Sequence, residues 1–170
     1  MAAYIALLRA VNVGGTGKLP MTELKSMCEE AGFRKVKTYI ASGNVVFESK
    51  LAEAKVKSLL EASLAAYAGK PVDVLVRTAA EMAAVLAANP FTEAATNSTV
   101  AIFLDHPPPA NALDAATGRR DEQMRLGLRE IYVHYGSGMG ESKLKIPAAK
   151  NGTARNLNTV AKLADMALNL

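Results

Sequence analysis

The stretch "AYIALLR", residues 3–9, is apolar at successive positions and predicts a central strand with both faces covered. The glycine-rich segment that follows, "AVNVGGTGKLP" at 10–20, marks the end of this strand. Pro20 suits the first position of a helix, and apolar side chains recur at helical spacing over residues 21–31, before Gly32. The chain is therefore expected to open with a strand, a loop and a helix.

Four further elements complete the first half of the chain. Apolar and polar side chains alternate over residues 36–40, and lysines on the polar side are typical of an edge strand. The "SGN" sequence at 42–44 is a hairpin signal, and "VVFE" at 45–48 returns as a strand. A second helix is predicted over 56–67 and a last strand over 72–76. This order is that of a ferredoxin-like unit, with antiparallel strands arranged fourth, first, third, second.

The second half repeats this pattern more loosely. The predicted elements are a linking helix (79–88), a strand (99–105), a weak helix near Leu113, a hairpin pair (123–128 and 131–135) and a last helix (153–168). They indicate a second ferredoxin-like unit that is distorted or lacks its last strand. The fold class is therefore α+β with tandem ferredoxin-like units, divided into residues 1–77, a linking helix and loop at 78–95, and residues 96–170.

Composition excludes several classes of protein. The chain has 170 residues, of which 50% are hydrophobic, and no apolar run is long enough to span a bilayer. Cys28 is the only cysteine, so an intramolecular disulfide is excluded. The apolar start "MAAYIALL" is cut short by Arg9 and has no basic leader, so it is interpreted as a strand. A cytoplasmic location without a membrane partner is expected.

Positive charge is concentrated in the first half of the chain. Residues 1–77 hold 11 Lys and Arg against 7 Asp and Glu, whereas residues 78–170 hold nine of each. This asymmetry favours an anionic partner, although a need for solubility would explain it equally well.

The loop after the first strand matches neither of the two common nucleotide-binding motifs. A Walker loop would need glycine where Asn12 stands, and Ser or Thr where Leu19 follows Lys18. The dinucleotide-binding pattern fails because Pro20 occupies the place of its third glycine. What remains is a glycine loop whose backbone N–H groups lead into a helix N-terminus, where an anion is favoured.

Topology adds a second argument for an anion site. In the ferredoxin-like order, the loop after the first strand and the hairpin between the second and third strands lie at the same end of the sheet. Thr153 is a plausible N-cap for the last helix, and Arg155 in its first turn would favour an anion there. The candidate anion-binding residues are Arg9, Asn12, Gly14, Gly15, Lys18, Ser42, Gly43, Asn44, Arg155 and Asn156.

Each of these features also has a purely structural interpretation. The loop glycines would serve a turn with positive φ, and Ser42, Gly43 and Asn44 would simply form a hairpin. Arg155 would pair with a carboxylate. Cys28 lies on the apolar stripe of its helix and is expected to be an inert core thiol.

Three stretches carry a resemblance to a known family. They are "LLRAVNVGGTGKLPMTELKSMCEEAGFRKVKTYIASGNVVF" at 7–47, "SKL" at 142–144 and "TARNLNTVAKL" at 153–163. Together they resemble the bacterial family DUF1697, whose N-terminal pattern falls on the loop and hairpin residues named above. Its C-terminal pattern falls on Thr153, Arg155 and Asn156, and Leu157 stands where the family often has Trp. The resemblance implies tandem ferredoxin-like folding and no established activity.

Three function classes remain open at this point. The first is a binding module for a phosphate-bearing small molecule or a nucleic acid, the second an enzyme with a site between the units, and the third a protein-binding scaffold. The sequence shows no nucleophile with a matched base, and His106 and His134 have no neighbours at metal-ligand spacing, so no metal or cofactor is expected. RNA-recognition modules stack bases on several rings, whereas the first strand here offers only Tyr4 and the third only Phe47. The oligomeric state is left open.

Overall fold

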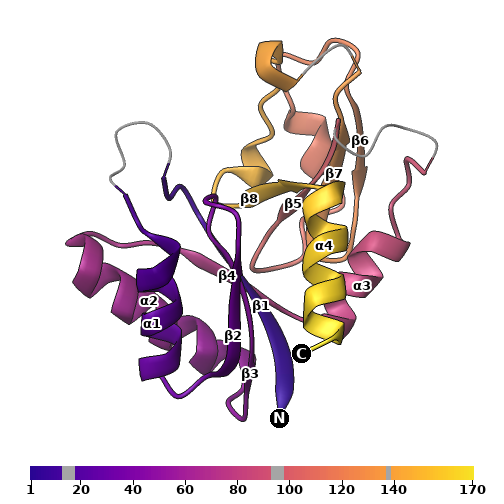
Figure 1. Cartoon of the computed structure of the whole chain (residues 1–170). Coiled ribbons are helices and arrows are strands. Elements are labelled where there is room, and N and C mark those ends of the chain that lie inside the picture. Colours follow the sequence, from indigo (N-terminus) through magenta and orange to yellow (C-terminus); the bar gives the residue numbers. More distant parts are fainter. Residues whose placement is uncertain (13–17, 93–97, 137–138) are drawn as a thin grey trace. The chain divides into compact units, whose positions relative to one another are not determined.

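The computed structural model describes residues 1–12, 18–92, 98–136 and 139–170 (Figure 1). Within these ranges the chain forms a mixed α+β fold with two four-stranded antiparallel sheets and four α-helices. It divides into two compact units, Met1–Met82 with Lys162–Leu170, and Ala83–Ala161. The predicted α+β class is confirmed. No helix in these described ranges is both long and apolar enough to cross a bilayer.

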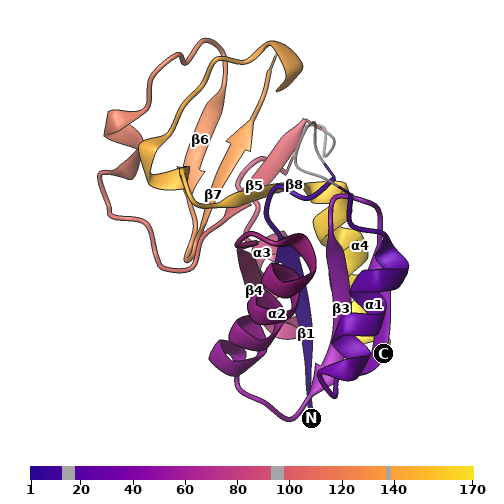
Figure 2. The same cartoon turned by 90° about the vertical axis from the view of Figure 1, so that its left-hand side faces the viewer.

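The first unit contains the strands and helices in the order that the sequence predicts. They are β1 (Ala2–Leu8), α1 (Met21–Glu30), β2 (Arg34–Tyr39), β3 (Asn44–Ser49), α2 (Glu53–Ala68) and β4 (Val74–Thr78). The strand order is β2-β3-β1-β4, and every neighbouring pair is antiparallel, as expected. Helices α1 and α2 lie side by side on one face of the sheet (Figures 1 and 2).

Both faces of β1 are buried, as its uninterrupted apolar sequence predicts. Tyr4, Ala6 and Leu8 pack in one cluster with the buried side chains of α1 and α2. Ile5 and Leu7, which point to the opposite face, are fully buried as well. The strand is covered on both faces and pairs with β3 on one edge and β4 on the other, so it lies in the middle of the sheet.

The edge strand β4 is protected by two charged residues of α2. The carboxylate of Glu61 accepts a hydrogen bond of 3.0 Å from the backbone N–H of Val74, and the ammonium of Lys57 donates to the carbonyl of Val74. The two side chains also form an ion pair at 3.0 Å. Backbone groups that could pair with another chain are therefore partly satisfied within the molecule.

The second unit differs from the first in its helices. Its elements are the end of α3 (Ala79–Ala87), β5 (Thr99–Phe103), the 3-10 turn η1 (Ala112–Ala115), β6 (Gln123–Leu126), β7 (Glu130–His134), the turns η2 (Met139–Glu141) and η3 (Pro147–Ala149), β8 (Thr153–Asn156), and the start of α4 (Leu157–Leu168). The strand order is β6-β7-β5-β8, all antiparallel. The weak helix expected near Leu113 is only a 3-10 turn.

Two expectations for the end of the chain are wrong. A fourth strand is present, because residues Thr153–Asn156 form β8 and pair with β5. Thr153 therefore lies in a strand and does not cap the last helix. The cap is Asn156, whose side-chain oxygen accepts a hydrogen bond of 2.9 Å from the N–H of Thr159.

The core position of Cys28 leads to a test of the helix assignment. Cys28 is fully buried beside Leu24, and burial raises the pKa of its thiol to about 12. At pH 8 the native thiol should react with a disulfide reagent at least about a hundredfold more slowly than the urea-unfolded chain, because both access and thiolate are limited. Equal rates in the two states would show that this face of α1 is misassigned.

Candidate functional site

The loop after β1 and the β2–β3 hairpin meet at one end of the first sheet. The N–H of Leu8 donates a hydrogen bond of 2.9 Å to the carbonyl of Gly43. The side-chain amide of Asn12 donates one of 2.7 Å to the carbonyl of Ala41 in the hairpin. These contacts join segments about thirty residues apart, as the topology predicts.

Asn12 holds this loop together. Its Oδ1 accepts a hydrogen bond of 2.6 Å from the N–H of Leu19, and its Nδ2 donates one of 2.9 Å to the carbonyl of the same residue. With the bond to Ala41, both amide hydrogens are engaged. Asn12 has φ +55°, a left-handed conformation that asparagine tolerates. The side chain of Asn12, a candidate anion-binding residue, therefore binds the backbone of the protein itself.

The hairpin residues also have structural partners. Asn44 is fully buried, and its Nδ2 donates hydrogen bonds of 2.9 Å to the carbonyl of Tyr39 and to the hydroxyl oxygen of Ser42. Gly43 has φ +91°, and a Cβ there would lie 2.6 Å from the side chain of Val11. These three residues thus build the hairpin and bring it against the loop after β1.

Arg9 has an acidic neighbour that the sequence analysis missed. The guanidinium of Arg9 lies 3.9 Å from the carboxylate of Asp73. The backbone N–H of Arg9 donates a hydrogen bond of 2.9 Å to the backbone carbonyl of Asp73. The positive charge of Arg9 at this edge of the sheet is therefore paired with a carboxylate. Antiparallel pairing of β1 with β4 places these residues opposite each other, because Leu8 pairs with Val74. The pair is solvent-exposed and contributes little to stability.

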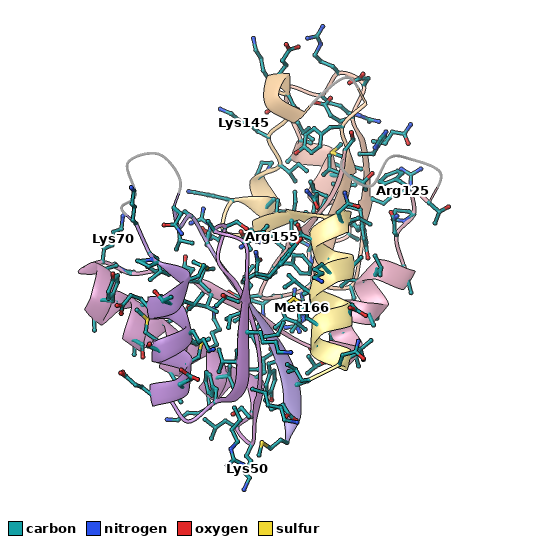
Figure 3. The ribbon with its side chains drawn as sticks, in the orientation of Figure 1. Lys50, Lys70, Arg125, Lys145, Arg155 and Met166 are labelled. Carbon is teal, nitrogen blue, oxygen red and sulfur yellow. The ribbon has the colours of Figure 1, made fainter. Side chains whose placement is uncertain are left out.

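A cleft of about 210 Å³ opens beside the loop after β1. Its floor is apolar, and its rim carries two lysines and a tyrosine, with no acidic side chain among the described residues that line it. Figure 3 shows Lys70 and Lys50 at opposite ends of the first unit. The lining residues are Ala10, Val11, Lys18 and Leu19 from the loop, and Leu64, Tyr67, Ala68, Lys70 and Val72 from the end of α2 and the connection to β4.

Sequence reasoning found only one of the polar residues of this cleft. The loop position of Lys18 predicts it at this edge, whereas the sequence pattern around Tyr67 and Lys70 gives no such signal. Tyr67 is 47% exposed. The missing signal was topological, because α2 runs toward the sheet end that carries the loop and hairpin. Gly14 and Gly15 lie outside the described residues.

The start of α1 contributes a third feature. The helix begins at Met21, and Pro20 is its N-cap in place of the first helical residue that the sequence predicted. Among the described residues no side chain caps this N-terminus by a hydrogen bond. The helix start follows the cleft residues Lys18 and Leu19 directly in the sequence.

Arg155 and Asn156 belong to the second unit. The guanidinium of Arg155 donates hydrogen bonds of 2.7 Å to the Thr153 hydroxyl and 3.0 Å to the Ala154 carbonyl. Its side chain is largely buried, and burial lowers the pKa of the guanidinium to about 10. Asn156 caps α4. Participation of these two residues in the site of the first unit stays a prediction.

No cluster of three or more metal-ligating side chains is found within the described parts of the chain. The arrangement at the sheet end instead offers ammonium groups, a phenol and an apolar floor. Such groups can bind an anion with an apolar body, since lysine supplies charge and the floor supplies burial.

Comparison with known proteins places the chain in a family. The model of the family described as "Protein of unknown function (DUF1697)" matches residues 1–132. The chain is a member of the DUF1697 family. A solved structure, that of conserved bacterial protein SP0830 from Streptococcus pneumoniae, is 25% identical, with a TM-score of 0.81 and 98% of each chain covered. No curated protein matches. The DUF1697 resemblance expected from the loop and hairpin motifs is confirmed, and it assigns no activity.

Substitution of Gly43 tests the contact between hairpin and loop. Gly43→Ala should destabilise the protein more than Gly32→Ala, because both residues have φ +91° but only a Cβ at Gly43 meets neighbours, Val11 and Leu8. We expect a loss of about 1 kcal/mol for Gly32→Ala and roughly 2–4 kcal/mol for Gly43→Ala in urea unfolding. Equal losses in the two variants would mean that the close approach of Gly43 to Val11 and Leu8 does not affect stability.

Removal of the Asn12 side chain tests its role in the loop. Asn12→Gly keeps the left-handed backbone conformation accessible and deletes the hydrogen bonds to Leu19 and Ala41. The expected loss is about 2–3 kcal/mol of unfolding free energy. Asn169→Gly, which removes an exposed asparagine near the C-terminus, serves as the control and should cost under about 1 kcal/mol. A similar small loss for both variants would contradict the assigned role.

Proposed function

We propose that the first unit binds a small anionic molecule, with a phosphate or carboxylate group on an apolar ring or chain, in the cleft beside the β1–α1 loop. The observation that carries this proposal is the lining itself. Lys18 and Lys70 stand at the rim of an apolar floor, and none of the lining residues is acidic. A site of this composition attracts negative charge and repels positive charge.

The apolar floor limits the kind of anion. Val11, Leu19, Leu64 and Val72 are each at most 9% exposed, so they form a closed surface against which a ring or short chain can pack. The volume of about 210 Å³ lies just below the range of drug-sized sites, about 300–1,000 Å³. A single ring or short chain with one charged group fits this space better than a dinucleotide.

The N-terminus of α1 supports the choice of an anion. The helix starts three residues after Lys18, and backbone N–H groups of a first helical turn favour negative charge by about 0.3–1 kcal/mol in exposed positions. No α1 residue is among the described residues that line the cleft, and Glu23 already lies in the first turn, so this helix is a secondary argument beside the two lysines.

Burial of the sheet favours a small molecule over a nucleic acid. Modules that bind RNA on a four-stranded sheet stack bases on exposed rings. Tyr4 and Phe47 are at most 5% exposed and pack with α1 and α2, so they are unsuited to stacking. Among the described strands of the first sheet, only Tyr39 of β2 is a partly exposed aromatic residue, and one ring gives a smaller stacking surface than those modules use.

We also infer that both units derive from a ferredoxin-like arrangement. The strand order β2-β3-β1-β4 of the first sheet has its counterpart in β6-β7-β5-β8 of the second. Turns η1 and η3 stand where the first unit has α1 and α2. This correspondence supports tandem units that have diverged in the segments covering the sheet.

Ligand titrations with matched variants test the proposed function. Phenyl phosphate should raise the melting temperature of the protein more than phenol or inorganic phosphate does, and added salt should reduce the effect. Lys18→Ala and Lys70→Ala should each weaken binding about fivefold, which corresponds to about 1 kcal/mol. Lys50→Ala, at the other end of the unit, is the control and should bind as the unchanged protein does.

The opposite result is equally clear. If the folded Lys18→Ala and Lys70→Ala variants bind phenyl phosphate as tightly as Lys50→Ala, the lysines of the cleft do not hold the anion. The proposed function is then wrong.

A further inference from the structure

One face of the second sheet is packed by turns and loops where the first unit has helices. The buried cluster on this face includes Val100, Ile131 and Val133 from the strands. Within the described residues, Ile102, Met124 and Leu126 also come from the strands, the other members come from the turns η1 and η3 and from segments outside regular elements, and none comes from an α-helix. Two short turns cover less of a sheet than two helices do, so part of the apolar face stays accessible.

A cleft of about 490 Å³ lies on this face, between the two turns. Ile102 and Tyr135, at the strands, are only partly buried and line the cleft together with Leu144 and Ile146. Its volume falls within the range of small-molecule sites, about 300–1,000 Å³. The cleft belongs wholly to the second unit and shares no residue with the cleft of the first.

Backbone contacts fix the walls of this cleft. Thr117 and Lys145 form an isolated antiparallel bridge, with N–H to carbonyl distances of 2.9 and 2.8 Å. Gly118 has φ +72°, and a Cβ there would lie 2.1 Å from the carbonyl oxygen of Lys143, so the two chain segments approach as closely as glycine allows. The cleft is therefore formed before any ligand arrives, which lowers the entropy cost of binding.

The charges of the cleft are of one sign. Lys145 and Lys150 are exposed residues of its lining, and none of the lining residues is acidic. Figure 3 shows the side chain of Lys145 extending away from the ribbon. Tyr135 adds a hydroxyl group, and burial, with a smaller effect from Glu122, raises the pKa of this phenol. At neutral pH the phenol is protonated and can donate a hydrogen bond to an anionic oxygen.

We propose that this cleft is a second binding site, specific for an amphipathic anion whose ring or branched chain packs on Ile102 and Ile146 and whose carboxylate or phosphate lies between Lys145 and Lys150. Apolar lining without charge would accept neutral molecules equally well. The two lysines and the absence of acidic lining residues provide the complementarity that selects an anion. This site rests on residues of its own and does not depend on the function proposed for the first unit.

Calorimetric titration of the full chain with naphthyl probes tests this second site. 2-Naphthoate or 2-naphthyl phosphate should bind, whereas 2-naphthalenemethanol, the neutral analogue, and acetate, which lacks the ring, should bind at least about fivefold more weakly. Tighter binding of naphthoate would identify a carboxylic acid as the ligand class, and tighter binding of naphthyl phosphate would identify a phosphate ester.

Matched variants locate the binding. The double substitution Lys145→Met and Lys150→Met removes both charges and keeps long unbranched side chains at the two positions. It should weaken binding of the tighter probe at least about fivefold. Lys143→Met, an exposed lysine of the same segment outside the cleft, is the control and should leave affinity unchanged. Lys18→Ala and Lys70→Ala should leave the amide shifts that the probe induces at Ile102, Thr117 and Ile146 unchanged, because those lysines line the other cleft.

Three results would overturn the proposal. They are a lack of binding by both anionic probes, equal affinities of the double variant and Lys143→Met, and a loss of binding in Lys70→Ala in place of the double variant. The last result would assign the probe to the first unit. The ligand-induced amide shifts in an NMR spectrum, expected at Ile102, Thr117 and Ile146, give an independent readout.

Discussion

The hydrogen bonds of the Asn12 carboxamide hold together the end of the first sheet that carries the candidate site. One side chain pairs with the N–H and carbonyl of Leu19 and with the carbonyl of Ala41, and so joins the start of α1, the end of β1 and the β2–β3 hairpin. Polar backbone groups in such a junction need partners, since an unpaired buried group costs about 1–3 kcal/mol. With the loop held in this way, Val11 and Leu19 lie against the end of α2 and form the cleft floor.

The pattern of apolar residues predicts the strands and helices of the first unit. In the second unit it does not predict strand β8. The apolar run of β1 and the helical stripe that contains Cys28 are local signals, and both side-chain sets are buried as expected. Strand β8 has only four residues, "TARN", and no apolar alternation. The sequence pattern therefore predicts these residues as the start of the following helix. Pairing with β5 is a tertiary contact that overrides this local pattern. Thr and Asn are both good N-caps, and only this pairing decides in favour of Asn156.

The topology of the ferredoxin-like unit predicts which segments of the chain meet at the candidate site. The sheet end shared by loop and hairpin was expected, but the same argument applied to α2 would also have placed Tyr67 and Lys70 there. Strand pairing would similarly have revealed Asp73 opposite Arg9. The engagement of both Asn12 amide hydrogens could not be predicted, because it depends on the path of one irregular loop. The similar solved structure supports the fold, and the DUF1697 match assigns no activity, so the chemistry has to be argued from these side chains.

We propose that the cleft at this end of the first sheet receives an anionic ligand. The most direct measurement is a series of amide NMR spectra of the full chain, recorded during titration with phenyl phosphate at low salt. We expect saturable shifts at residues around this cleft, foremost Lys18, Leu19, Lys70 and Val72, separate from shifts at the cleft of the second unit. No saturable shift at these four residues at any concentration, or larger shifts around Lys50 than around them, would contradict the proposal.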